Sequence, residues 1–408
     1  MSGDILFLCH RVPFPPDRGD KIRSHNLLKR LAQVAPVHVG CFADDDRDVG
    51  FAAEMAALAA SQCVLMRDRS RAVAGLTGLA KGQSLLIALF DHPALHEWVR
   101  RTLAEKPIRA VFAYSAQMAH FVPMLPPHIR FMMDFVDLDS AKYAAYGAER
   151  SGPMAWINRR EGRVLLEFER ATAARADLCS FVSGAEAGLF RAVSGESAEK
   201  VVGLENGVAL DYFDPAADFA PVERGPGPLL VFTGQMDYRP NVEAVESFAR
   251  ATLPAIRAVH PDARFAIVGR NPTPAVQALA GLPGVVVTGC VPDVRGWLAA
   301  ADLVVAPLRI ARGIQNKVLE AMAMARPVVA SPQAAEGIDA QHEAHFIIAA
   351  NPVEEAARII DLLSRPHRAR ELGVAARARM EARYRWSATL ARLPELLFGA
   401  SAADAVAA

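Results

Sequence analysis

The residues whose types and spacing best suit chemistry lie in segment 301–331, ADLVVAPLRIARGIQNKVLEAMAMARPVVAS. Lys317 and Glu320 are three positions apart, so on a helix they share a face. A cation in the first helical turn suits a diphosphate, and a carboxylate one turn deeper suits a vicinal diol. An ordinary salt bridge on a solvated helix is the competing interpretation of this spacing.

The elements around this pair are those of an open α/β sheet. Leu303–Ala306 predicts a buried strand, Pro307–Gly313 a loop and Asn316–Met324 a short helix, followed by another strand. The loop therefore follows the carboxyl end of a parallel strand and leads into the amino end of a helix. Backbone N–H groups and the helix dipole favour anions at such a place. Two loop residues add positive charge, Arg309 and Arg312.

Apolar runs of strand length alternate with helical patterns along the whole chain. In the first half the predicted strands are Asp4–Cys9, Val37–Phe42, Cys63–Met66, Ala110–Tyr114, Arg130–Met133 and Leu178–Val182. In the second half they are Leu229–Thr233, Arg264–Val268, Val285–Thr288, Leu303–Ala306 and Val328–Ala330. Continuous Val/Ile/Leu runs indicate strands covered on both faces, so the sheets should be parallel. This pattern predicts two doubly wound α/β domains.

A connector between the two halves is visible in the composition. Asp214–Pro228 concentrates Pro and Gly and shows neither a helical nor a strand period. We predict an N-terminal domain at 1–208, a linker at 209–228 and a second domain at 229–385. The remaining residues, 386–408, are expected to form a helix that returns to the first domain, with a disordered tail.

Length and composition exclude several classes of protein. The chain has 408 residues, enough for two domains, and 45 basic against 45 acidic residues, which argues against nucleic-acid binding by a global basic field. No apolar run has the roughly 18 residues of a spanning helix, and the N-terminus lacks the pattern of a signal peptide. The five cysteines are scattered, which favours a reducing compartment. We therefore expect a cytoplasmic protein.

Peripheral contact with the inner face of the cytoplasmic membrane is a further hypothesis. The apolar stretch Leu85–Phe90 follows a basic one, and such a combination could rest on an anionic leaflet. A buried apolar segment beside solvated basic residues is the competing interpretation. The basic residues concerned are Arg67, Arg69, Arg71 and Lys81.

Two short patterns suggest metal binding only weakly. His92 and His96 are four positions apart, but Asp91 and Pro93 indicate a helix start, and such histidine pairs are usually incidental. Asp137 and Asp139 form an Asp-x-Asp tripeptide, a pattern that binds metal diphosphates in one enzyme architecture, but it is unspecific by itself and the two-domain layout disfavours it. No metal ion is expected in the reaction, because basic residues stand where a metal-dependent enzyme would have carboxylates, and guanidinium and ammonium groups can neutralise a diphosphate directly.

Longer motifs across nearly the whole chain resemble glycosyltransferase family 4, the retaining enzymes of the GT-B architecture. Residues 320–329, EAMAMARPVV, match the family signature E-A-M-A-x-G-x-P-V-V, and Val268-Gly269 matches its V-G strand end. Residues 231–236 open the second domain as in family members, and residues 205–208 match the end of the first. The segment 13–32, PFPPDRGDKIRSHNLLKRLA, more narrowly resembles sugar transferases of bacterial exosortase (PEP-CTERM) exopolysaccharide loci.

This resemblance implies a fold and a set of site residues. The fold would be two Rossmann-like domains whose parallel sheets face each other across a cleft. Catalysis is expected to involve Lys317, Glu320 and Asp137, the last orienting an acceptor or sugar hydroxyl; helix capping is its alternative role. The donor-binding residues would be Gly234, Gln235, Gly269, Arg309, Arg312 and Asn316, and the loop facing acceptor and phosphates would supply Gly19, Asp20 and Arg23.

The chain departs from the family pattern at charged positions. The first of the family's two glutamates would fall at Arg312, and its basic pair at Gln235 and Asn241. The histidine often found in the first domain would fall at Val136. Lys317, together with Arg309 or Arg312, is the expected substitute for the missing diphosphate cations.

The predicted function is retaining, metal-independent hexosyl transfer from a UDP- or GDP-sugar to a glycan or lipid-linked acceptor, in bacterial exopolysaccharide synthesis. No cofactor is expected, because the nucleotide sugar is a co-substrate. A nucleotide-sugar epimerase of the same architecture and a non-catalytic nucleotide-sugar-binding protein remain as alternatives.

Overall fold

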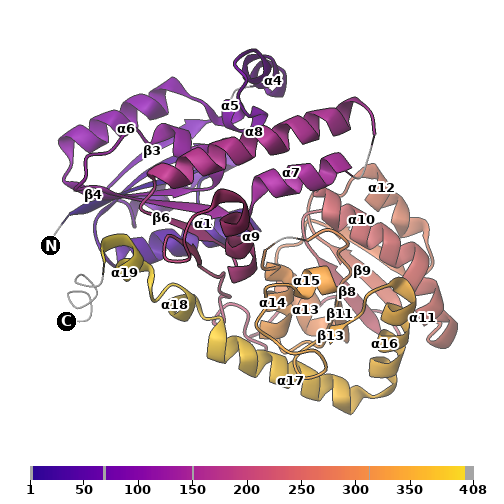
Figure 1. Cartoon of the computed structure of the whole chain (residues 1–408). Coiled ribbons are helices and arrows are strands. Elements are labelled where there is room, and N and C mark those ends of the chain that lie inside the picture. The colour runs from indigo at the N-terminus through magenta and orange to yellow at the C-terminus, as the bar shows by residue number, and fades with distance from the viewer. Residues whose placement is uncertain (1–2, 68–69, 149–150, 312, 400–408) are drawn as a thin grey trace. The chain divides into compact units, whose positions relative to one another are not determined.

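The computed structural model describes residues 3–67, 70–148, 151–311 and 313–399, and Figure 1 shows the whole chain. The chain forms two compact units. Unit 1 comprises Met1–Glu205 and the segment that begins at Leu390, and unit 2 comprises Asn206–Thr389. The linker expected at 209–228 thus falls within unit 2, whose first residue precedes the predicted domain end.

Unit 1 is built on a seven-stranded sheet in the order β3-β2-β1-β4-β5-β6-β7, with every pairing parallel. Its inner strands are almost completely buried, so their apolar runs reflect cover on both faces. The strands are β1 Asp4–Cys9, β2 Val37–Ala43, β3 Ser61–Met66, β4 Ile108–Tyr114, β5 Arg130–Val136, β6 Leu178–Phe181 and β7 Val201–Gly203.

The helices of unit 1 connect these strands in the order of a doubly wound fold. They are α1 Gly19–Ala32, α2 Asp46–Gly50, α3 Ala52–Ala56, α4 Arg71–Ala80, α5 Leu85–Phe90, α6 Pro93–Glu105, the 3-10 helix η1 Ala116–Phe121, α7 Asp139–Ala148, α8 Pro153–Arg175 and α9 Gly184–Ser194. The last helix within the described residues, α19 Leu393–Phe398 (Figure 1), also belongs here, and it contacts α1 and β5.

Unit 2 repeats this topology with a six-stranded parallel sheet in the order β10-β9-β8-β11-β12-β13. Relative to its own first strand, this is the order 3-2-1-4-5-6 of a Rossmann fold. The strands are β8 Leu229–Thr233, β9 Arg264–Val268, β10 Val285–Gly289, β11 Leu303–Ala306, β12 Val328–Ala330 and β13 Ile347–Ile348.

The helices of unit 2 follow the strands in alternation. They are α10 Arg239–Ser247, the π-helix η2 Phe248–Thr252, α11 Leu253–Val259, α12 Pro274–Ala278, the 3-10 helix η3 Leu279–Gly281, α13 Val294–Ala300, α14 Asn316–Ala323, α15 Pro332–Ala335, α16 Pro352–Ser364, α17 Pro366–Arg383 and α18 Trp386–Thr389. None of the helices in the described ranges combines the length and apolar character needed to cross a membrane.

The predicted fold class is confirmed by these two parallel sheets. All eleven predicted strands are present, and the loop and the helix after β11 lie where the sequence predicts them. The sequence missed β7 and β13, which have only three and two residues, too few for a recognisable apolar run.

Each unit has one point at which the strand order reverses, between β1 and β4 in unit 1 and between β8 and β11 in unit 2. Open α/β sheets bind ligands beyond the carboxyl ends of the strands at this point. The candidate residues after β8 and β11 therefore lie at the favoured position of unit 2, and those after β1 at that of unit 1.

Candidate functional site

Two glycines bring the backbone of strands β8 and β9 close together in unit 2. Gly234 directly follows β8 and Gly269 directly follows β9, and the Gly234 amide donates to the carbonyl of Val268 at 3.0 Å. A Cβ atom at Gly269 would lie 1.6 Å from the carbonyl oxygen of Gly234. Only glycine fits this close approach of the two strand ends.

Lys317 places a cation against this strand end. It lies in the first turn of α14, and its half-buried ammonium donates to the side-chain oxygen of Asn241 on α10. The ammonium also lies 4.3 Å from the ring centre of Phe232 on β8. It forms no ion pair with any residue that the structure describes, so the salt bridge to Glu320 considered above is absent. Burial lowers the pKa of Lys317 to about 7, an effect that nearby Glu320 opposes.

Glu320 and Asn316 lie on the same helix as Lys317. Burial raises the pKa of the Glu320 carboxyl to about 7, against the opposing effect of Lys317. The Asn316 side-chain oxygen accepts from Asn206 at 3.0 Å, which fixes the start of α14 to the first residue of unit 2. The structure therefore brings Lys317, Glu320 and Asn316 together on one short helix.

The structure also reveals a cation that the sequence analysis missed. Arg270 follows Gly269, and its Nε and Nη2 atoms donate to the Gln235 side-chain oxygen at 3.0 and 3.1 Å when the Gln235 amide is turned so that its oxygen faces the guanidinium. A basic group is thus present beside the position where the family pattern would have one. The signal available in the sequence was a charged residue directly after the strand end Val268-Gly269.

A buried hydroxyl at the same strand end lacks a partner. Thr233, the last residue of β8, is 4% exposed, and its Oγ1 atom forms no hydrogen bond with any described residue. Buried hydroxyls are normally satisfied, so an unsatisfied one next to Gly234 is a feature expected where a polar ligand binds.

The structure does not bring Arg309 to the lysine. The exposed Arg309 donates to Ser247 at the end of α10, whereas Lys317 contacts Asn241 near its start. Six residues along a helix span about 9 Å, so the two cations have partners at opposite ends of α10. The interpretation of Arg309 as a diphosphate ligand is not supported by this arrangement. Arg312 lies outside the described residues.

In unit 1, the loop after β1 forms a cluster of charged groups around Asp20. The Asp20 carboxylate accepts from Arg18 at 2.7 and 3.0 Å, from Arg11 at 2.7 Å and from His10 at 3.2 Å. The hydroxyl of Tyr114, which ends β4, donates to the Asp20 carbonyl at 2.9 Å. Burial opposes ionisation, but these partners outweigh it and hold the pKa of Asp20 well below its usual range. Asp20 therefore anchors the loop.

Arg23, expected in the loop facing the phosphates, lies instead in the core of unit 1. It is 1% exposed and forms a two-fold hydrogen bond with the fully buried Asp134, at 2.9 and 3.2 Å. A guanidinium held in this way is not available to a ligand, so the expectation for Arg23 is corrected. Gly19 is exposed and begins α1. The cations that the loop does carry, Arg11 and Arg18, were not predicted.

Asp137 follows an unusual backbone turn at the carboxyl end of β5. Val136, the last residue of that strand, has a φ angle of 71°, and the strand pairing shifts between Asp134 and Val136. A β-branched residue in this left-handed region is strained, and such strain gathers at functional sites. Burial raises the pKa of Asp137 to about 7, and the nearby Lys142 opposes this shift. Asp137 can therefore hold or release a proton near neutral pH.

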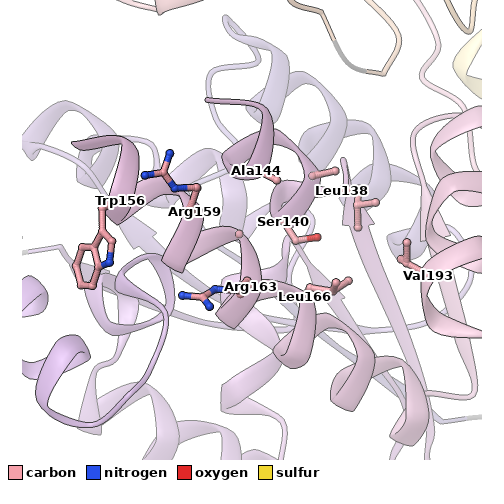
Figure 2. Close-up of a pocket in the computed structure, with 10 residues that line it drawn as sticks. Leu138, Ser140, Ala144, Trp156, Arg159, Arg163, Leu166 and Val193 are labelled. Atoms are coloured by element: carbon pink, nitrogen blue, oxygen red, sulfur yellow. The ribbon is translucent and has the colours of Figure 1, made fainter. Parts of the chain in front are cut away.

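A cavity of about 570 Å³ begins next to Asp137. Leu138 and Ser140 line it from the start of α7, and Trp156, Arg159 and Arg163 from α8, as Figure 2 shows. The last three residues are spaced to share one face of the helix. The cavity thus combines apolar walls with two exposed guanidinium groups.

The apolar stretch considered for membrane contact is helix α5, which packs into unit 1. Its residues Ile87, Ala88 and Phe90 are buried, and Arg67 pairs with Asp44 at 2.9 Å. This supports the competing interpretation of a buried apolar segment. Arg69 lies outside the described residues.

Comparison with known proteins agrees with this geometry in unit 2. Residues 227–365 match the family model "Glycosyl transferases group 1". This range contains both glycine strand ends and helix α14. No curated protein matches the sequence significantly.

Solved structures match the chain over nearly its full length. Sucrose-phosphate synthase from Thermosynechococcus elongatus has a TM-score of 0.70 at 20% identity, covering 97% of this chain and 98% of that one. WaaG, a glycosyltransferase involved in lipopolysaccharide biosynthesis, has a TM-score of 0.66 at 16% identity, covering 97% and 100%. Anabaena HepE in complex with UDP-glucose has a TM-score of 0.65 at 15% identity, covering 99% of each chain. These matches identify the fold as that of GT-B proteins.

Proposed function

We propose that this protein is a glycosyltransferase that moves a hexosyl group from a nucleotide-sugar donor to a glycan or lipid-linked acceptor, with retention of configuration. The observation that carries the proposal is Lys317, a half-buried ammonium without an ion pair to any described residue, at the amino end of α14. A cation in this position attracts an anion of matching size, and the neighbouring helix start adds backbone donors.

The other donor contacts would come from groups at the two strand ends. The diphosphate would lie against the backbone near Gly234 and Lys317, and the Thr233 hydroxyl and Arg270 would add hydrogen-bond donors. Glu320, deeper on α14, would accept hydrogen bonds from the ribose hydroxyls. The titles of the HepE complexes name UDP and UDP-glucose, so UDP-glucose is the first donor to test.

The chemistry assigned to these residues is electrostatic. When the glycosidic bond to the nucleotide breaks, negative charge grows on the departing diphosphate, and Lys317 and Arg270 would stabilise it. Preorganised cations are suited to this task, and it requires no metal ion. The acceptor hydroxyl would then attack the same face of the oxocarbenium-like sugar, with the protein supplying position more than covalent chemistry.

On the acceptor side, unit 1 offers Asp137 and the adjacent cavity. A carboxyl with a pKa near 7 can accept the proton of an attacking hydroxyl or orient that hydroxyl. The apolar cavity with Arg159 and Arg163 would suit an acceptor that has both an apolar part and a phosphate. A role in bacterial exopolysaccharide synthesis rests on the sequence resemblance described above, and so does the retaining outcome.

The test combines binding with turnover. Nucleotide sugars are screened for thermal stabilisation of the full-length protein, and the best donor is incubated with and without acceptor glycans while nucleotide release is measured. We expect stabilisation by one class of nucleotide sugar and nucleotide release that depends on acceptor. Turnover of donor alone would favour an epimerase, and tight binding without turnover on any acceptor would favour a binding protein.

A further inference from the structure

Two histidines and a carboxylate meet on the surface of unit 1, outside the residues used above. Asp91 precedes helix α6, His96 lies in its first turns, and His120 comes from the 3-10 helix η1. The Nε2 atom of His96 lies 3.1 Å from the Oδ1 atom of Asp91, and that of His120 lies 3.6 Å from the same oxygen. Ligand atoms of all three residues lie within 4.8 Å of one another.

These distances resemble those of a metal coordination shell. In a tetrahedral zinc site with bonds of about 2.0–2.1 Å, two ligand atoms are separated by about 3.3 Å. The two separations from Asp91 Oδ1, 3.1 and 3.6 Å, lie on either side of this value. Two imidazoles and one carboxylate are also a ligand set that divalent zinc accepts, with a fourth position left for water.

His120 is held in the orientation that a ligand needs. Its Nδ1 atom lies 2.7 Å from the carbonyl oxygen of Gln117, so Nδ1 carries a proton and donates it, and Nε2 is the ring nitrogen that lies near Asp91. That Nε2 atom is buried and has no hydrogen-bond partner among the described residues. The ring packs against Phe121 with centres 3.9 Å apart, and the His96 ring contacts the same phenyl at 4.5 Å.

The site is accessible from solvent. The side chains of Asp91 and His96 are 37% and 42% exposed, and a cavity of about 450 Å³ is lined by all three cluster residues. An ion can therefore reach the cluster, and a water molecule can complete its coordination.

The sequence pattern indicated a different pair. His92 and His96 share a helical spacing, but the Nδ1 atom of His92 accepts from the Ala94 amide at 3.2 Å and caps α6. The His92 side chain is thus already hydrogen-bonded as the cap of its own helix. The partner that replaces it, His120, is 24 positions away from His96 and could be found only through the fold.

We propose that Asp91, His96 and His120 form a binding site for a divalent metal ion of the zinc class, separate from the transfer chemistry. The bound ion would cross-link the start of α6 to η1 and so stabilise unit 1. It differs from the Asp137–Asp139 pair, in which a metal would contact the substrate.

The experiment uses full-length protein whose affinity tag has been removed, because a histidine tag binds the same metals. Zinc is titrated into chelator-treated protein in competition with a chromophoric indicator, and cobalt is added separately to observe the visible absorption of a tetrahedral complex. We expect one equivalent of zinc per chain, a tetrahedral cobalt spectrum and a higher melting temperature with zinc.

Variants assign the site. His96→Ala and His120→Ala should each weaken zinc binding at least tenfold, and the isosteric Asp91→Asn should weaken it with little effect on folding. His92→Asn, which keeps a helix cap, and Cys290→Ser, which removes an exposed thiol, are the matched controls and should bind zinc normally. Where an alanine variant does not fold, His96→Gln and His120→Gln replace it.

The proposal is overturned if the wild-type protein binds no stoichiometric zinc. It is equally overturned if the ligand variants, shown to be folded by circular dichroism, keep the wild-type affinity. Loss of binding in Cys290→Ser alone would assign the metal to that thiol and reject the histidine site.

Discussion

The ammonium group of Lys317 donates to the side-chain oxygen of Asn241, and the side-chain nitrogen of Asn241 donates at 2.8 Å to the carbonyl of Gln235. One asparagine therefore connects helix α14 to the loop after β8. It occupies a position where the family pattern would have a cation, and here it orients a cation that comes from another element. Under the proposed function, this lysine would supply the charge that the family pattern places elsewhere in the chain.

Lys317→Ala should reduce transferase turnover by about two orders of magnitude, because a preorganised cation facing developing charge contributes about 3 kcal/mol. Glu320→Gln should mainly weaken donor binding, because hydrogen bonds to ribose form in the ground state too. Steady-state kinetics separate the two effects. Lys106→Ala, at an exposed lysine of unit 1, is the control and should leave both turnover and donor binding unchanged. Near-normal turnover in a folded Lys317→Ala protein would contradict the phosphate assignment.

Arg270→Met should weaken UDP-glucose binding roughly tenfold, since a hydrogen bond to a charged group contributes about 1.5 kcal/mol or more. Arg250→Met provides the matched control, because Arg250 is an exposed arginine of the same unit. Isothermal titration calorimetry measures both. Equal affinities for the two variants would show that Arg270 serves only to hold the Gln235 side chain.

Gly269→Ala should both destabilise unit 2 and abolish donor binding, because the new methyl group would meet the Gly234 carbonyl at 1.6 Å. Separating the two strand ends would cost about 1–3 kcal/mol. Gly281→Ala is the control, since a Cβ at Gly281 has no atom within 4 Å. Thermal melts with and without UDP-glucose give both readouts, and a Gly269→Ala protein that melts and binds like Gly281→Ala would contradict the close approach.

Donor binding above neutral pH should take up a proton. Lys317 has a pKa of about 7 in the free protein because of burial, and a bound diphosphate raises it. Below pH 7 the lysine is already charged; above pH 7 it must gain its proton on binding, so affinity falls by up to about tenfold per pH unit. UDP-glucose is the suitable probe, because its diphosphate does not titrate in this range as a terminal phosphate would.

This proton uptake is measured by calorimetry at pH 8 in two buffers of different ionisation enthalpy. Because Glu320 also titrates near pH 7, the measurement is repeated in the Glu320→Gln background. Lys317→Met should abolish the uptake. Buffer-independent heats for the wild-type protein would rule out a neutral lysine in the free state.

Glu169→Gln should stabilise the protein more at pH 8 than at pH 5. Glu169 is fully buried, accepts from the Ser140 amide at 3.1 Å, and burial raises its pKa to about 8 from an ordinary 4.5. Protonation of Glu169 therefore contributes to the stability of the folded protein. This contribution is complete below about pH 4.5 and is lost as the pH rises toward 8. Glutamine keeps the acceptor without the charge.

The measurement is the difference in melting temperature between variant and wild type, which should grow by several degrees from pH 5 to pH 8. Glu161→Gln is the contrasting variant on the same helix. Glu161 accepts from the hydroxyl of Ser84 and from the amides of Leu85 and Leu86, so its replacement should destabilise. A pH-independent difference for Glu169→Gln would mean that the carboxylate stays ionised in the folded protein.

Most of the fold could be predicted because the buried parallel strands are themselves apolar runs. β1, β8, β9, β11 and β12 begin and end where the sequence predicts. The edge strands β7 and β13 could not be predicted, because two or three residues carry no periodicity and depend on their neighbours for pairing.

The arrangement of the candidate site could be predicted only for residues that are near one another in sequence. The three-residue spacing of Lys317 and Glu320 predicted that they share one helix, as they do on α14. The contacts of Asn241, Arg270 and His120 depend on which elements are neighbours in the fold, and the burial of Arg23 depends on its pairing with Asp134, 111 positions away. Spacing along the chain contains no information on such contacts.

The assignment of α19 to unit 1 affects the order in which the protein can fold during synthesis. Unit 2 is continuous in sequence, whereas unit 1 consists of the first 205 residues and the segment from Leu390 onward. Domains generally fold as units while the chain emerges from the ribosome. Unit 1, whose synthesis begins first, is thus completed last, because α19, which packs against β5 and α1, is synthesised after all of unit 2.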